Sequence, residues 1–366
     1  MTRQICAFTF FCLYALANAS ADWPLFRGDS LQTGVSKEKL PDKLEILWKF
    51  ATKEAIESTA AIAGGMVYVG SYDEHLYAID LVSGKEKWKF KAGPIKAAVS
   101  YKDGNVYAGN IDGDFHCFEA ATGKKRWTFK TDGEISSGAN FNGDNVLFGS
   151  GDEHLYCVSK DGKEVWKYKV PGGPVMGSPA LAGERTFAAG CDSVLHVLDV
   201  VKGKEVGKVE IGSPVGDSAA VVGDRLYVGT MSSNEVLAID WQKPAIIWKF
   251  QAPKLPNAFV ASVAATDNLI ITGSKDKRVW AIDRKTGKEA WSFPTEKQVT
   301  SSPVVVGQRV FAGSLDGKLY VLDLAKGTLL QKLDLGGPIS ASPAVGSGCL
   351  VIGTEKGLVY CFGAKP

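Results

Sequence analysis

Apolar and polar positions alternate along this chain in short runs, and the runs recur at a fixed period. The segment VYVGSYDEHLYAID (67–80) shows the unit: an apolar run that ends at Gly70, a polar turn, and a second apolar run that ends at Asp80. Such alternation is typical of half-buried β-strands. A turn of the TGK type and a run such as KWKF follow, and a stretch of small residues precedes. The pattern predicts four short strands per unit and no helix of ordinary length.

The unit occurs eight times, and the marker glycines are 39 to 44 residues apart. Units of four strands with a period near forty residues are typical of β-propellers. The sequence therefore predicts an all-β fold, an eight-bladed β-propeller of four-stranded antiparallel blades. The marker glycines are Gly70, Gly109, Gly149, Gly190, Gly229, Gly273, Gly313 and Gly353.

The two ends of the chain indicate how the propeller closes. The last copy stops at CFGAKP without its final strand, and an unassigned LWKF (47–50) precedes the first copy. We expect this N-terminal strand to complete the last blade, which removes an open sheet edge. The predicted organisation is a signal peptide at 1–21, an N-terminal lead-in at 22–44 and the propeller at 45–366.

The first residues resemble an export signal. Arg3 precedes a mostly apolar run from Ile5 to Leu16, which is short for a membrane span, and Ala19-Ser20-Ala21 fits a cleavage site. We expect cleavage after Ala21, with an uncleaved N-terminal anchor as the alternative. No lipoprotein-type cysteine context is present, so the sequence predicts a periplasmic or secreted protein.

Composition excludes several classes of partner. The formal net charge is +2, and no basic block stands out from the interspersed charges. The chain therefore lacks the electrostatic footprint of a nucleic-acid-binding protein. No apolar run beyond the N-terminal one is long enough to cross a membrane, so we expect no transmembrane span in the mature chain, and we expect a monomer.

Five cysteines lie beyond the expected signal peptide, an odd number that cannot form a complete disulfide framework. Cys117, Cys157 and Cys361 share one position of the repeat, where other copies have Ala or Val, so we expect small buried apolar residues there. Cys349 and Cys361 can lie in one hairpin, and a disulfide between them stays open.

One aromatic position recurs near the end of most copies. A Trp once per blade can pack against the neighbouring blade and bury a large apolar area. Repetition favours a structural role, because a catalytic residue is needed once and a packing residue in every blade. Gly207 and Gln331 stand at this position in the two degenerate copies. The expected blade-docking residues are Trp48, Trp88, Trp127, Trp166, Trp248 and Trp291.

The phrase AIDRKTGKEAW (281–291) and its near copy AIDLVSGKEKW (78–88) resemble the tryptophan-docking motif of pyrroloquinoline quinone (PQQ) repeats. The opening WPLFRGDSLQTGVS (23–36) is similar to the lead-in of the same superfamily. The resemblance covers nearly all of the mature chain and implies the propeller fold. It leaves function open, because the superfamily includes both quinoprotein alcohol dehydrogenases and BamB, a non-catalytic subunit of the machinery that inserts outer-membrane β-barrels.

The resemblance implies a specific site for an enzyme. Quinoprotein dehydrogenases hold PQQ on the propeller axis between a Trp and a disulfide of adjacent cysteines, beside a Ca²⁺ bound by Glu, Asn and often Asp. This sequence has no adjacent cysteine pair, and its connections are short and even. We therefore expect a BamB-like scaffold that binds a protein partner through one propeller face, with no catalytic residue and no cofactor. The alternatives are a small PQQ- and Ca-dependent quinoprotein dehydrogenase, a PQQ-binding sensor, or a carbohydrate-binding propeller.

The segments expected to line the axis consist mostly of Ser, Ala, Gly and Thr. Glu57, Lys96 and Asp217 are the polar exceptions. Glu57 and Lys96 occupy equivalent positions on adjacent blades, so we expect an ion pair between them. The two carboxylates with Asn140 form the alternative, a weak cation site.

Overall fold

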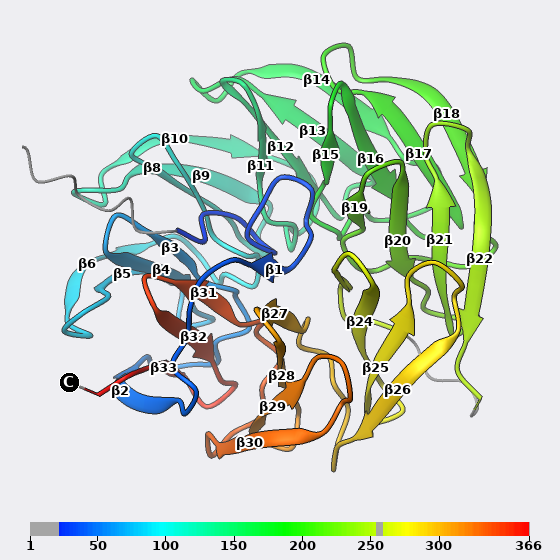
Figure 1. Cartoon of the computed structure of the whole chain (residues 1–366). Helices are drawn as coiled ribbons and strands as arrows, with labels where there is room; N and C mark the ends of the chain where they lie inside the picture. The colour runs from blue at the N-terminus through cyan, green and yellow to red at the C-terminus, as the bar shows by residue number, and fades with distance from the viewer. Residues whose placement is uncertain (1–21, 254–258, 366) are drawn as a thin grey trace, which may run out of the picture.

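The computed structural model describes residues 22–253 and 259–365, and within these ranges the chain contains strands but no helix, so none that could span a membrane. Eight sheets are arranged around a common centre, as Figure 1 shows. The predicted all-β, eight-bladed propeller is confirmed. The expected signal peptide at 1–21 lies outside the described residues.

Each blade is an antiparallel sheet whose first strand lies nearest the centre. The first four blades follow one another along the chain. Blade 1 comprises β3 (Ala61–Ala63), β4 (Met66–Gly70), β5 (His75–Asp80) and β6 (Glu86–Lys91). Blade 2 comprises β7 (Ser100–Lys102), β8 (Asn105–Gly109), β9 (Asp114–Glu119) and β10 (Lys125–Lys130). Blade 3 comprises β11 (Asn140–Asn142), β12 (Asn145–Gly149), β13 (His154–Val158) and β14 (Glu164–Lys169). Blade 4 comprises β15 (Leu181–Ala182), β16 (Arg185–Ala189), β17 (Val194–Asp199) and β18 (Lys204–Glu210).

The next three blades repeat this order, and blade 7 gains the short parallel strand β1 (Val35–Ser36) beside β27. Blade 5 comprises β19 (Ala220–Val222), β20 (Arg225–Gly229), β21 (Glu235–Asp240) and β22 (Ala245–Gln251). Blade 6 comprises β23 (Ala264–Ala265), β24 (Leu269–Ser274), β25 (Arg278–Asp283) and β26 (Glu289–Pro294). Blade 7 further comprises β27 (Val304–Val306), β28 (Arg309–Gly313), β29 (Lys318–Asp323) and β30 (Leu329–Asp334).

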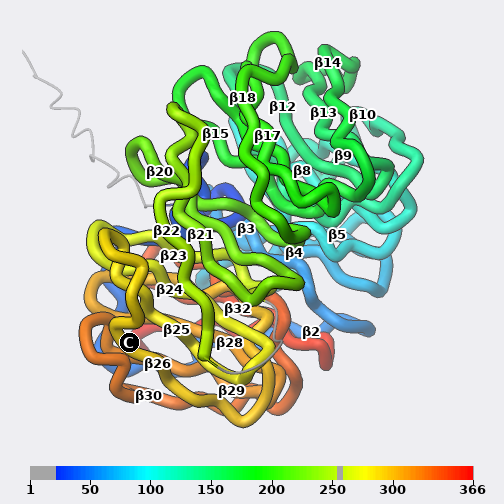
Figure 2. The backbone as a smooth tube through the Cα atoms, turned by 90° about the vertical axis from the view of Figure 1, so that its right-hand side faces the viewer, coloured from blue at the N-terminus to red at the C-terminus, as the bar shows by residue number. Residues whose placement is uncertain are grey.

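Blade 8 joins the two ends of the chain. Its inner strands are β31 (Ala344–Gly346), β32 (Cys349–Gly353) and β33 (Leu358–Gly363), and its outer strand is β2 (Glu45–Ala51). Trp48 pairs with Cys361, and the blue and red ends of the chain lie side by side in Figure 2. The predicted closure by the N-terminal strand is confirmed.

The strands follow their sequence pattern. The second and third strands of each blade are buried on both faces, whereas the outer strands alternate between exposed and partly buried residues. Continuous apolar runs therefore form the middle of each blade, and the alternating KWKF-type runs form its rim. This division places the expected docking residues on the outer strands.

The six tryptophans bind the neighbouring blade in one recurring geometry. The indole nitrogen of Trp291 donates to the carbonyl of Leu324 at 2.9 Å, and the other five indoles form equivalent bonds of 2.7–3.2 Å. Each indole also covers the glycine of the TGK-type turn in the next blade, where a Cβ would lie within 2.7 Å of the ring. The glycine is therefore required by the close approach, and each of the six indoles contacts the neighbouring blade.

The residue beneath each indole is small. On the third strand, Trp88, Trp248 and Trp291 each face Ala, and Trp48, Trp127 and Trp166 each face Cys. The two copies without Trp have Val at this place, with Val197 opposite Gly207 and Val321 opposite Gln331. The three buried cysteines are thus small residues that leave room for an indole, as expected. Cys349 and Cys361, for which a disulfide stayed open, are free thiols in the structure.

The N-terminal lead-in is a strap across the centre of one face, visible as the dark blue segment in Figure 1. We use "strap" for residues 23–44. The strap forms hydrogen bonds to all eight blades. In blade 1, Trp23 and Ile62 exchange two backbone hydrogen bonds. In blades 2 to 7, carbonyls of the strap accept the bonds: Pro24 from Tyr101 N, Ser30 from Asn140 Nδ2 and Leu181 N, Leu31 from Val221 N, Thr33 from Ala265 N, and Gly34 from Val305 N. In blade 8, the carboxylate of Glu38 accepts from Gly348 N.

Candidate functional site

A cavity of about 510 Å³ occupies the propeller axis. Its wall is built from the residues that enter the first strand of each blade, and Phe26 of the strap closes one end. Glu57 and Lys96 lie at the other end, so the cavity is a funnel. We call it the axial funnel, and it contains the position at which the resemblance predicts a cofactor in the enzymes.

Hydroxyl groups on successive blades connect the wall of the axial funnel. The amide of Ser178 donates to the hydroxyl of Ser218 at 2.7 Å, and the amide of Ser218 donates to Ser262 at 3.1 Å. The same bond joins six of the eight blade boundaries, and it ends where Ala98 and Gly138 replace the hydroxyl. Because these oxygens accept bonds from the neighbouring blade, they stabilise the ring of blades. The remaining bonds join Gly138 to Ser178, Ser262 to Ser302, Ser302 to Ser342 and Ser342 to Thr59.

Arg27 of the strap is buried at the closed end of the axial funnel, with 1% of its surface exposed. Its guanidinium donates to the carbonyls of Ser302 at 3.0 Å and Val263 at 3.3 Å, and also to Pro303. Burial lowers the pKa of Arg27, while Asp29 and Asp217 act in the opposite direction. The strap therefore binds blades 6 and 7 through a buried cation as well as through backbone hydrogen bonds.

Glu57 and Lys96 both line the open end of the axial funnel. The expected ion pair between them is wrong, since neither residue forms one in the described part of the chain. Lys96 is exposed at the funnel mouth, and Glu57 instead interacts with Tyr72. Burial and this contact with Glu57 raise the pKa of Tyr72 to about 12.

Asp217 lines the axial funnel and also a small internal pocket between blades 4 and 5. Its Oδ2 is buried without a hydrogen-bond partner. Burial raises the pKa of Asp217 well above its usual value, against the opposing effects of Arg27 and Lys275. The equivalent residues Ser58 and Ser137 accept hydrogen bonds from Gly70 N and Gly149 N. Asp217 thus places a carboxyl group at a position where the other blades have only Ser, Ala or Gly.

Asn140 does not lie on the axis, which corrects the sequence-based expectation. Its side-chain nitrogen donates to the carbonyls of Ser30 and Pro179, both at 2.8 Å, and its oxygen accepts from Phe141 N at 2.8 Å. The amide is therefore fully used in joining the strap to blades 3 and 4. It stands at the end of the first strand, beyond the short stretch that faces the funnel.

The axial residues do not fit the ligand set of a quinoprotein calcium site. Asn140 is committed to backbone carbonyls, and the cation of Lys96 shares the funnel mouth with Glu57. The described residues contain no group of three or more His, Cys, Asp or Glu side chains that could hold a metal ion. We therefore derive no step through PQQ or calcium.

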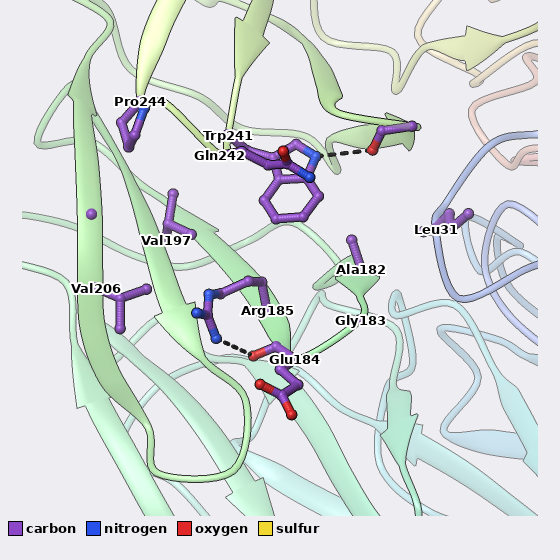
Figure 3. Close-up of a pocket in the computed structure, with 12 residues that line it drawn as sticks. Leu31, Ala182, Gly183, Glu184, Arg185, Val197, Val206, Trp241, Gln242 and Pro244 are labelled. Atoms are coloured by element: carbon purple, nitrogen blue, oxygen red, sulfur yellow. Dashed lines mark hydrogen bonds between the residues drawn. The ribbon is translucent and has the colours of Figure 1, made fainter.

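A second hollow, of about 650 Å³, lies between blades 4 and 5, at one of the two boundaries that lack a docking tryptophan. We call it the blade 4–5 groove. Figure 3 shows Val197 and Val206 of blade 4 facing Trp241 and Pro244 of blade 5, with Arg185 at one side. The sequence analysis did not predict this groove, although Gly207 at the Trp position indicated that a docking side chain is missing there.

The family model described as "Outer membrane protein assembly factor BamB" matches residues 42–115, 111–206 and 191–366. Three curated relatives differ in how much of each chain is matched. BamB of Burkholderia pseudomallei is 24% identical over 82% of this chain and 82% of its own length. BamB of Legionella pneumophila is 25% identical over 50% of this chain and 49% of its own length. The beta-alanine-activating enzyme of Danio rerio is 36% identical over 28% of this chain, and the match spans 10% of that enzyme.

Two solved structures share the fold. BamB from Moraxella catarrhalis superimposes with a TM-score of 0.75 at 19% identity, covering 88% of this chain and 100% of that chain. Quinohemoprotein alcohol dehydrogenase from Comamonas testosteroni superimposes with a TM-score of 0.82 at 16% identity, covering 96% of this chain and 82% of that chain. At such identities the likeness shows the fold alone.

Proposed function

Since the chain belongs to the family described as outer membrane protein assembly factor BamB, we propose that it is a non-catalytic propeller that binds a protein partner in outer membrane protein assembly. We further propose that residues 1–21 direct export and that the mature protein acts in the periplasm. In this role the propeller presents a rigid surface, and no covalent bond is made or broken.

The observation that carries the proposal is the family match, which extends over residues 42–366. The axial funnel supports it, because six of the eight blade boundaries use their wall groups for hydrogen bonds between blades. Enzymes instead place free polar groups around the reacting atoms. A PQQ-dependent oxidoreductase remains the second candidate, because the propeller of a quinohemoprotein dehydrogenase covers 96% of this chain.

The proposal is tested in the native host. Deleting the gene is expected to lower the amount of folded outer membrane proteins, measured by quantitative proteomics of the outer membrane, and the wild-type gene is expected to restore it. An unchanged outer membrane profile would contradict the proposal.

The second candidate is tested by calorimetric titration of the purified mature protein with PQQ and Ca²⁺. We expect no saturable heat. Binding of about one PQQ per chain, a stoichiometry that one axial site dictates, would replace the scaffold by a quinoprotein. Glu57 and Asp217 would then be the first residues to substitute, since both line the axial funnel.

A further inference from the structure

The blade 4–5 groove exists because both sides of one docking contact have changed. Gly207 replaces the tryptophan of blade 4, and Pro244 stands in the turn of blade 5 where the other docked turns have glycine. A Cβ on Gly207 would lie 2.9 Å from Pro244 Cγ. The proline therefore prevents blade 4 from filling the space with a side chain of its own, and the boundary stays open.

The floor of the groove is apolar and fixed in position. Trp241 of blade 5 packs edge-to-face on Phe187 of blade 4, with ring centroids 5.7 Å apart. Its indole nitrogen donates to Gly223 O at 3.1 Å, as the dashed line in Figure 3 shows. Leu31 of the strap lines the same space. A preformed aromatic floor favours an aromatic or branched aliphatic side chain, because little order is lost when it binds.

The rim of the groove is also apolar. Val206 on β18 is 52% exposed, and Ile247 at the equivalent position of β22 is 44% exposed. Blades 1 and 2 have Lys87 and Arg126 at this position of the repeat, where charge is tolerated. Of these two residues only Val206 lines the groove, where it adds to the apolar surface of Trp241 and Pro244. Exposed apolar surface of this kind often marks a binding site in soluble proteins.

Arg185 and Glu184 stand together at one side of the groove. The guanidinium of Arg185 donates to the carbonyl of Glu184 at 3.1 Å, and it forms no ion pair within the described residues. Arg185 therefore retains donors for a carboxylate of a ligand, and arginine binds carboxylates with directional hydrogen bonds.

We propose that the blade 4–5 groove docks an extended segment of a partner protein, which places an aromatic side chain against Trp241 and a neighbouring carboxylate at Arg185. This inference rests on the proposed protein-binding function and names the chemistry of the partner at one surface.

The probe is a display library of random twelve-residue peptides selected on the purified mature protein. We expect the enriched peptides to carry Trp, Tyr or Phe beside Asp or Glu. Val206→Lys and Arg185→Glu are each expected to weaken their binding by about tenfold or more, the effect of losing one well-placed contact. Val206→Lys copies the lysine of blade 1 and is expected to fold, which circular dichroism and the melting temperature check.

The matched control is Leu330→Lys, at the same repeat position of blade 7, where the wild-type side chain is 53% exposed. This variant is expected to keep its affinity within about twofold, since single surface charges away from an interface have small effects. A library that yields no enriched peptide overturns the inference, as do peptides that bind Val206→Lys and Leu330→Lys equally well.

Host complementation separates this inference from the proposed function. Restoration of the outer membrane profile by Leu330→Lys but not by Val206→Lys supports both. Restoration by both variants refutes partner docking at the groove and leaves the proposed assembly role intact. Peptide binding at the groove, together with an unchanged outer membrane profile in the deletion strain, refutes the assembly role and supports docking at the groove.

Discussion

Gly207 pairs with Val197 across β17 and β18, at the register where six other blades pair a tryptophan with alanine or cysteine. The pairing shows that the docking position and the residue beneath it vary together. Valine at 197 narrows the space that an indole would need, and Pro244 restricts it from the facing blade. Three linked residues therefore distinguish the blade 4–5 boundary from its neighbours.

The triple variant Val197→Ala, Gly207→Trp, Pro244→Gly is expected to restore the missing docking contact. A newly buried indole contributes about 2–4 kcal/mol at most, from burial of roughly 150 Å² or more of apolar surface. The free energy of unfolding, measured by urea titration, should therefore rise above that of the wild type.

Gly207→Trp alone is expected to destabilise the protein, because the indole would meet Val197 and the pyrrolidine ring of Pro244. Overpacking of this kind costs about 1–3 kcal/mol. A single variant as stable as the triple variant would show that the three positions are independent of one another.

Gly327→Ala tests the glycine beneath a docked indole. Gly327 has φ +67°, and a Cβ there would lie 2.5 Å from Trp291. Gly307→Ala is the matched control, because Gly307 has φ +57° and a Cβ there would have no neighbour within 4 Å. Both variants carry backbone strain of about 1–2 kcal/mol. We expect Gly327→Ala to lose about 1–3 kcal/mol more, from overpacking, in thermal unfolding. Equal losses would mean that the indole moves aside freely.

Asp217→Ser is expected to stabilise the protein near neutral pH. The folded protein raises the pKa of Asp217 above its unfolded value of 3.8, so ionisation is harder in the folded state. This penalty is absent below about pH 3.8, where both states are protonated, and grows as the pH rises above it. The serine hydroxyl can also accept from Gly229 N, as Ser58 and Ser137 do from the equivalent glycines.

The measurement is urea unfolding of wild type and Asp217→Ser at pH 4.5 and pH 7.0. The variant should gain more stability at the higher pH than at the lower one, because the penalty for ionising the buried carboxyl group in the folded protein grows with pH. A gain that does not depend on pH would show that Asp217 ionises as readily in the folded protein as in the unfolded chain.

Asn140→Ala is expected to loosen the strap. The substitution leaves the carbonyls of Ser30 and Pro179 without their donor, and each buried group left unpaired costs about 1–3 kcal/mol. Limited proteolysis should cut within residues 23–44 sooner than in the wild type, as mass spectrometry of the fragments would show. Asn142→Ala, on the same strand and at a partly exposed site, is the control and should be cut at the wild-type rate.

The repeat made the fold predictable from this sequence. Eight copies of one pattern determined the number of blades, and the unassigned run that contains Trp48 determined how they close. The same comparison of copies identified the docking tryptophans, because a position that recurs in equivalent strands must have an equivalent environment. The role of Cys117, Cys157 and Cys361 followed in the same way.

The candidate site was less predictable, because its features are departures from the repeat. Asn140 stands at the end of a strand, and only the path of the strap decides that its amide meets Ser30 rather than the axis. Glu57 and Lys96 are equivalent in sequence, but Glu57 interacts with the hydroxyl of Tyr72, a residue outside the segments that enter the first strands. The blade 4–5 groove could not be predicted from one copy of the repeat, because Gly207 belongs to one copy and Pro244, which it faces, belongs to the next.

The strap and blade 8 also impose an order on folding. Thr52 bonds to Gly357, 305 residues further along the chain, and Val35 pairs with Val305. These early residues leave the ribosome long before their partners exist, and contacts of such high sequence separation form slowly. Blade 8 and the ring as a whole must therefore remain incomplete until the last residues are made. A chain truncated near its C-terminus would lose β33 and, with it, the pairing between β2 and β33 that joins the two ends of the polypeptide.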